Sequence, residues 1–99
     1  MLNITKKKED TKLDIALEGR LDTTTAPQLD ETVNAEIEGV KELNFDFSAL
    51  EYVSSAGLRV LLSAQKKMNK QGSMVIRNVS EEINEIFNVT GFSDILTIE

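Results

Sequence analysis

Hydrophobic and polar residues alternate along several short parts of the chain. Leu13, Ile15 and Leu17 fall on one side of the segment LDIALEG, with Asp14 and Glu18 on the other. The same alternation begins earlier, over residues 2–4, and returns over 41–48. A period of two with apolar residues on one side is typical of half-buried strands. The intervening segment KKED predicts a hairpin between the first two strands.

Residues 23–39 instead repeat their apolar side chains every three or four positions, which predicts an amphipathic helix. The apolar face of this helix consists of Ala26, Leu29, Val33, Ile37 and Val40. Thr25 and Gln28 have the spacing of a capping box, in which each side chain bonds the other residue's backbone N–H. Pro27 is tolerated in the first turn, where its missing N–H costs nothing. Gly39 is expected to end the helix in a left-handed conformation.

Two further helices are expected after the third strand. One begins at about Ala56 and ends at Gly72, and the other is capped by Ser80. Residues 73–79 form a short strand between them, and residues 94–99 follow as a final strand or extended tail. The order β-β-α-β-α-β-α-β predicts an α/β fold with a mixed β-sheet and helices packed against it.

Composition and charge narrow the class of protein. The 99 residues fit one domain over 1–99, and the initial Met1 leads us to expect a complete small protein. The net charge of −6 argues against a nucleic-acid binder, which needs clustered positive charge. The one basic run, residues 6–8, is interpreted as a solvated hairpin end because Glu9 and Asp10 follow it. Since no export signal or membrane-spanning apolar run is visible, a cytoplasmic protein without membrane insertion is expected.

The chain contains no histidine and no cysteine. This excludes histidine phosphorelay, Ser-His-Asp catalysis, disulfides and thiol chemistry. No Gly-rich phosphate loop is present, and no motif supports or excludes nucleotide binding. We therefore expect no catalytic residue, no metal site and no cofactor, although an enzyme stays open as an alternative because an α/β fold can host an active site.

Two adjacent hydroxyls, Ser54 and Ser55, lie where a strand ending at Val53 gives way to a helix. One of them is expected to be the N-cap, which accepts a hydrogen bond from a free helical N–H and contributes about 1 kcal/mol. The second hydroxyl is not needed for that task, and a phosphate on it would meet an anion site already formed by the helix end. Gly57 has two interpretations, close packing against a neighbouring strand or close approach of a partner.

Three segments in the same order resemble the STAS family, the fold of bacterial anti-sigma factor antagonists. They are FDFSALEYVSSAGLRVLL, LEGRLDTTTAPQL and IFNVTGFSDILTI, which together extend the resemblance over nearly the whole chain. The resemblance implies a partner switch. An unphosphorylated antagonist, expected to be a monomer when free, binds an anti-sigma factor serine kinase with a histidine-kinase-like ATPase fold and so releases the sigma factor. Phosphorylation by that kinase breaks the complex, and a metal-dependent Ser/Thr phosphatase resets it.

The resemblance also assigns residues. The family's phosphoserine falls on Ser55, and the preceding position, often Asp in the family, is Ser54 here, which leaves Ser54 as an alternative acceptor. The family's loop aspartate falls on Asp22, whose alternative role is to cap its own turn. Arg59 is interpreted either as a partner to a carboxylate or as a simply exposed arginine. The expected partner-binding residues are Asp22, Thr23, Thr24, Ser54, Ser55, Ala56, Gly57, Leu58 and Arg59.

The departure at Ser54 keeps a second role open within the same family. Some family members bind partners without phosphorylation, as scaffolds or as soluble partners of a membrane transport system. The sequence predicts a binding protein in both cases, and the two roles differ in whether Ser55 is modified.

Overall fold

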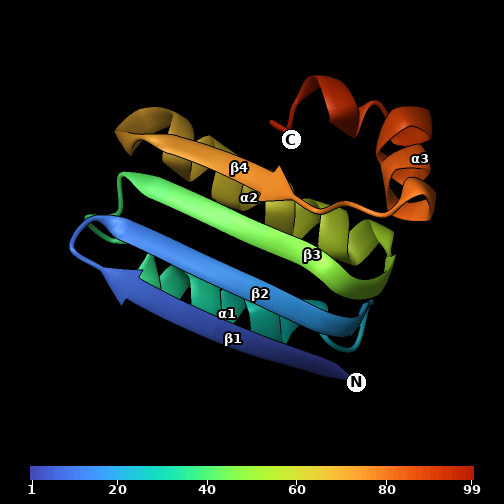
Figure 1. The fold of residues 1–99 in the computed structure, drawn as a ribbon, viewed down its shortest axis with the longest axis horizontal. Helices are drawn as coiled ribbons and strands as arrows, with labels where there is room; N and C mark the ends of the chain where they lie inside the picture. Colours follow the sequence, from blue (N-terminus) through green and yellow to red (C-terminus); the bar gives the residue numbers. More distant parts are fainter.

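The computed structural model describes all 99 residues, and four strands in it form one sheet in the order β1-β2-β3-β4. The strands are β1 (Leu2–Glu9), β2 (Lys12–Leu21), β3 (Glu42–Val53) and β4 (Ser73–Arg77). β1 pairs antiparallel with β2, and the other two pairings are parallel. The helices are α1 (Ala26–Glu36), α2 (Ser55–Gln71) and α3 (Glu81–Thr90). Figure 1 shows α1 and α2 behind the sheet, on one face, and α3 beside the end where β2, β3 and β4 finish. The expected mixed α/β fold is confirmed.

The alternating residues of the two central strands form the core beneath α1 and α2. The side chains that are at most 1% exposed there are Leu13, Ile15, Leu17, Leu43, Phe45 and Phe47. The ring of Phe47 lies 6.0 Å from that of Phe45 and 6.4 Å from that of Phe87 on α3, centroid to centroid. Aromatic pairs at such separations are favourable beyond the area that they bury. The third helix is therefore attached to the sheet through Phe87.

The first helix differs from its prediction at both ends. Pro27 lies in the first turn as expected, but the Thr25 side chain makes no capping hydrogen bond, so the predicted capping box is wrong. The Thr25 hydroxyl bonds the preceding loop instead, as described below. The helix ends at Glu36, and Gly39, although left-handed with φ of 80°, lies in the loop beyond it.

The end of the chain also differs from the predicted order. After Gly91 ends α3 in a left-handed conformation, a 3-10 turn η1 (Phe92–Asp94) follows in place of the start of a strand. Only the last residues then reach β4, where Ile98 forms a single parallel bridge with Ile76. The eighth element of the predicted order is therefore an extended tail. Its first residue, Asp94, belongs to the 3-10 turn, and only Ile98 pairs with β4.

The basic run near the N-terminus is exposed and lies at the hairpin, as expected. The Lys6 Nζ atom lies 2.9 Å from Glu36 Oε1, and Lys8 donates a hydrogen bond of 3.2 Å to the backbone oxygen of Glu36. Positive charge is favourable at that place because the C-terminal end of a helix carries partial negative charge. Two lysines of the basic run thus stabilise the C-terminal end of α1. No helix in the structure has both the length and the apolar character to cross a membrane.

Candidate functional site

The candidate site is formed where β2 and β3 end side by side. Leu21 and Val53, the last residues of these parallel strands, are register partners. The chain leaves β2 through the loop at 22–25 and leaves β3 directly into α2. The Ser54 amide donates a hydrogen bond of 2.8 Å to the Leu21 carbonyl oxygen. The two segments that the sequence singled out are therefore neighbours, at the right-hand end of the molecule in Figure 1.

The two serines have different environments. Ser54 has extended backbone angles, and its Oγ accepts a hydrogen bond of 3.3 Å from the Gly57 amide, which makes it the N-cap of α2. Ser55 is the first helical residue, is exposed, and its hydroxyl makes no hydrogen bond within the protein. The prediction that one serine caps the helix is confirmed for Ser54, and the hydroxyl of Ser55 is free.

Gly57 is buried against β2. A Cβ at this position would lie 2.7 Å from Leu21 Cγ and 3.1 Å from the Leu21 carbonyl oxygen, closer than such atoms pack. The close-packing interpretation of Gly57 is confirmed. Leu58 is 4% exposed and belongs to the core. These two expected partner-binding residues therefore position the helix, because Gly57 has no side chain to separate it from Leu21 and the side chain of Leu58 is buried.

Asp22 caps its own loop, as one of its two interpretations proposed. Its Oδ1 accepts hydrogen bonds of 2.8 Å from the Thr24 hydroxyl, 3.0 Å from the Thr24 amide and 3.2 Å from the Thr25 amide. The Thr24 hydroxyl, followed by the Thr25 and Thr24 amides, holds the pKa of Asp22 below its ordinary value. Because the side chain is half-buried and not enclosed, an ionised carboxylate stays in reach of a partner at this loop.

The three threonines after Asp22 have separate roles. Thr25 is buried, and its hydroxyl donates a 2.8 Å hydrogen bond to the Arg20 carbonyl while accepting one of 2.8 Å from the Asp22 amide. Thr24 is exposed and bonds only Asp22. Thr23 is exposed and makes no hydrogen bond with its side chain. The loop is thus fastened by Thr25, and Thr23 and Thr24 form its surface.

Arg20 and Tyr52 lie in the site although the sequence did not single them out. The Arg20 guanidinium carbon lies 4.4 Å from the centroid of the Tyr52 ring, and its Nε lies 3.9 Å from Asp22 Oδ2. Tyr52 is 36% exposed, a high fraction for a large aromatic side chain. Only the register of β2 with β3 pairs these two residues, so no local pattern could have found them.

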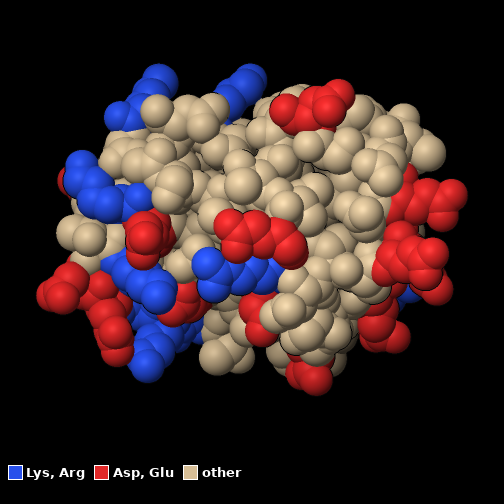
Figure 2. All heavy atoms as spheres, turned by 45° about the horizontal axis from the view of Figure 1, so that its top comes forward, with Lys and Arg blue, Asp and Glu red and all other residues tan.

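The charge around the site is mainly negative. A hollow of about 580 Å³ next to β3 and α3 is lined by Arg20, Leu50, Glu51, Ser80, Glu81, Glu82 and Glu85. In Figure 2 the right-hand end of the molecule shows Asp and Glu side chains with very little Lys or Arg, whereas the other end shows Lys and Arg side chains together with Asp and Glu. Arg59, exposed on the first turns of α2, forms no ion pair in the structure. A cation without a carboxylate partner therefore lies at the N-terminal end of α2, residues 54–59, which we call the mouth of α2.

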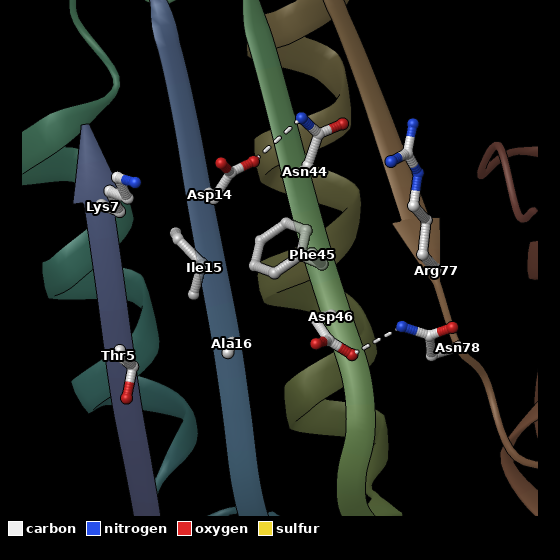
Figure 3. Close-up of a pocket in the computed structure, with 10 residues that line it drawn as sticks. All are labelled: Thr5, Lys7, Asp14, Ile15, Ala16, Asn44, Phe45, Asp46, Arg77 and Asn78. Atoms are coloured by element: carbon white, nitrogen blue, oxygen red, sulfur yellow. Dashed lines mark hydrogen bonds between the residues drawn. The ribbon is translucent and has the colours of Figure 1, made fainter. Parts of the chain in front are cut away.

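A second, separate depression of about 320 Å³ lies on the face of the sheet that no helix covers (Figure 3). Neighbouring side-chain amides hold its carboxylates. Asn44 donates a hydrogen bond of 3.0 Å to Asp14, and Asn78 donates one of 3.0 Å to Asp46. The Ser48 amide, followed by the Asn78 side chain, lowers the pKa of Asp46. These carboxylates are acceptors for polar neighbours and belong to the outer side of the predicted alternation.

Known proteins resemble the chain over almost its whole length. The family model of the STAS domain matches residues 3–99. An anti-sigma-B factor antagonist of Listeria monocytogenes is 34% identical over 98 residues, which cover 95% of this chain and 84% of that protein. An anti-sigma factor antagonist from Mycobacterium paratuberculosis superposes with a TM-score of 0.88 at 21% identity, covering 99% of this chain and 85% of that one.

The anti-sigma factor antagonist SpoIIAA of Bacillus has the same fold. Its unphosphorylated form has a TM-score of 0.78 and covers 98% of this chain and 87% of its own. Its phosphorylated form has a TM-score of 0.77 and covers 98% of this chain and 91% of its own. Both are 18% identical to this chain, a level at which the likeness concerns the fold.

Proposed function

The chain belongs to the STAS domain family, and we propose that it is an anti-sigma factor antagonist controlled by phosphorylation of Ser55. In this proposal the unphosphorylated protein is a cytoplasmic monomer. It binds an anti-sigma factor serine kinase with a histidine-kinase-like ATPase fold, and the sigma factor is released. The names of the relatives in Listeria and Mycobacterium support the role of antagonist. The protein acts by binding and not by catalysis.

The observation that carries the proposal is the difference between the two neighbouring hydroxyls. A phosphate on Ser54 would compete with the capping bond to Gly57, whereas the Ser55 hydroxyl is exposed and has no bond to lose. A phosphate on the first helical residue would also lie near the partial positive charge of the helix end. The solved phosphorylated form of SpoIIAA, which shares this fold, supports control by phosphorylation.

The proposed partner surface consists of exposed or half-buried groups from the two neighbouring segments. Asp22, Thr23 and Thr24 contribute from the loop, and Ser54, Ser55, Ala56 and Arg59 contribute from the mouth of α2. Tyr52 adds an exposed aromatic ring beside them, and tyrosine and arginine are frequent among the residues that dominate binding. The buried Gly57 and Leu58 hold this surface in place.

The switch follows from charge. Unmodified, the mouth of α2 presents small neutral side chains and one cation, so a partner can close over it. A phosphate adds about −1.5 to −2 charges to an end that is already acidic. Against a kinase that holds nucleotide phosphates, like-charge repulsion and the cost of desolvating the new phosphate oppose binding. No change of fold is required, and a metal-dependent Ser/Thr phosphatase restores the binding form.

The test is intact-mass and peptide mass spectrometry after incubation with ATP and each histidine-kinase-like serine kinase from the same genome. We expect one kinase to add one phosphate, mapped to Ser55, which is lost in Ser55→Ala and kept in the matched variant Ser54→Ala. The same kinase should bind the unmodified protein and release the phosphorylated one. A phosphate on Ser54 would overturn the assignment. An unchanged mass with every kinase would favour the alternative, a constitutive module that serves as a scaffold or as a partner of a transport system.

A further inference from the structure

We propose that Arg59 holds the phosphate of phosphorylated Ser55 within the same chain. The inference rests on the proposed function, because it concerns the modified form of the protein. Arg59 follows Ser55 by four positions on α2, and both residues are exposed. Residues four apart lie on the same face of a helix, with their Cβ atoms about 5 to 6 Å apart.

The direction of helical side chains brings the two groups closer. Side chains on an α-helix lean towards its N-terminus, so a long residue covers the turn that precedes it. A long side chain at position 59 can therefore reach back over the turn that begins with Ser55. A phosphate on the Ser55 hydroxyl would extend outwards into the range of that guanidinium.

Arg59 is available for this role. The ion pairs of the structure involve Lys6, Lys7, Arg20 and Arg77, and none involves Arg59. Between Lys41 and Lys66 it is the only cationic residue in the chain.

The other charged groups near the mouth of α2 do not replace Arg59. Arg20 already stacks on the Tyr52 ring and lies near the Asp22 carboxylate. Asp22 and Glu51 are anionic and would repel a phosphate. Arg59 is therefore the cation left to neutralise it.

The chemistry of the pair suits a phosphate. A phosphate has three strong acceptor oxygens, and a guanidinium can donate two parallel N–H bonds to such a group. A lysine would offer a point charge without this fork. Holding the phosphate would also withdraw Arg59 from any partner that contacts it in the unmodified state. One modification would thus add an anion to the surface and occupy its free cation.

The experiment uses protein with phosphoserine placed at position 55 during synthesis, so that no kinase is needed. The phosphate is titrated by ³¹P NMR in the wild type, in Arg59→Gln and in Lys66→Gln. Lys66 is an exposed residue on the same face of α2, and its replacement removes the same charge about 16 Å along the helix axis from Ser55. At moderate salt, interactions between exposed charges are largely screened over about 10 Å.

We expect Arg59→Gln to raise the second pKa of the phosphate by roughly 0.15 to 0.4, and Lys66→Gln to change it by less than about 0.1. Arg59→Lys should give an intermediate value. The Arg59 Nε–H signal should shift as the phosphate ionises. Equal effects of Arg59→Gln and Lys66→Gln, or an Arg59 signal that ignores the titration, would overturn the proposal. Because the phosphate is installed synthetically, this result is independent of whether any kinase modifies Ser55.

Discussion

The Ser54 amide donates a hydrogen bond of 2.8 Å to the carbonyl oxygen of Leu21, and this bond joins the mouth of α2 to the end of β2. The side chain of Leu21 also packs against Gly57, one turn into the helix. The Asp22 loop and the Ser55 hydroxyl are therefore held in fixed relation by the backbone and the core. A surface formed in this way can respond to a phosphate without a change of fold.

The first prediction concerns Gly57→Ala. The added Cβ would lie 2.7 Å from Leu21 Cγ and 3.0 Å from its Cδ2, so Leu21 must move or the helix must shift. We expect the free energy of unfolding to fall by about 1 to 3 kcal/mol, measured by urea denaturation. The sign is decisive, because alanine in place of glycine in an uncrowded helix would stabilise the protein by about 1 kcal/mol.

A double variant tests the cause of that loss. If the clash with Leu21 is responsible, Leu21→Ala and Gly57→Ala together should cost less than the sum of the two single changes, because the shorter side chain makes room for the new methyl group. Full additivity would show that the contact with Leu21 does not account for the effect.

The second prediction separates the two serines by stability. Ser54→Ala removes the cap on the Gly57 amide and should cost about 1 kcal/mol. Ser55→Ala removes a hydroxyl without a partner and should change stability by less than about 0.5 kcal/mol. Urea denaturation of both variants, side by side, measures the difference. Equal losses would contradict the assignment of Ser54 as the cap.

The third prediction concerns the fastening of the loop. Thr25→Val keeps the shape of the side chain and removes its hydroxyl, which leaves the Arg20 carbonyl and the Asp22 amide without their bonds. We expect a loss of about 1 to 3 kcal/mol in thermal or urea denaturation. The matched variant Thr23→Val, at an exposed threonine without a hydrogen bond, should be near neutral. A neutral Thr25→Val would show that the loop does not depend on that hydroxyl.

Local patterns predicted those parts of the fold in which one face is buried. The alternation in β2 and β3 and the spacing in α1 follow from burial, which acts on each element separately. The capping box at Thr25 failed because its hydroxyl bonds the Arg20 carbonyl and the Asp22 amide, partners set by the path of the loop. The sequence alone could not show that the Thr25 hydroxyl would bond the loop and not the end of the helix.

The candidate site was predictable to a similar degree. Asp22 and Ser55 carry local motifs, so the resemblance assigned them. The contact between Arg20 and Tyr52 depends on the register of β2 with β3, which passes two irregularities before these residues pair. Such register shifts leave no clear mark in the sequence, and the pair was therefore missed.

The fourth prediction is a pH dependence at Asp22. The folded pKa is lowered, by the Thr24 hydroxyl above all and by the Thr25 and Thr24 amides, so the unfolded chain binds the proton more readily. The contribution of the carboxylate is thus complete above its unfolded pKa of about 3.9 and is lost as the pH falls through the lower folded value. We expect the stability difference between wild type and Asp22→Asn to be constant from about pH 7 to pH 5 and to shrink below about pH 4.

Urea denaturation over this pH range measures the difference, with Glu31→Gln as the control. Glu31 is an exposed carboxylate on α1 outside the loop, and its replacement removes the same charge. A difference between wild type and Asp22→Asn that persists unchanged to about pH 3 would show that the ionised form of Asp22 does not hold the loop.

The last prediction concerns Tyr52 as a contact for the proposed kinase partner. Its ring is 36% exposed, lies against the Arg20 guanidinium and precedes the Ser54 cap by two residues, so a partner that covers Ser55 would cover it as well. Aromatic side chains in such positions often contribute more than 1 kcal/mol to binding. We expect Tyr52→Ala to weaken binding of the unphosphorylated protein about tenfold or more in isothermal titration calorimetry. Tyr52→Phe, which keeps the ring over Arg20, should bind within about threefold of the wild type.

A second control distinguishes this surface from the other depression. Ala16→Leu fills the hollow on the open face of the sheet, about 20 Å along β2 from Asp22, and should leave kinase binding unchanged. If Ala16→Leu weakens binding and Tyr52→Ala does not, with both variants folded, the partner contacts the open face of the sheet. The Ser55 phosphate would then have to act on binding from a distance, and direct charge repulsion at the mouth of α2 would no longer explain the switch.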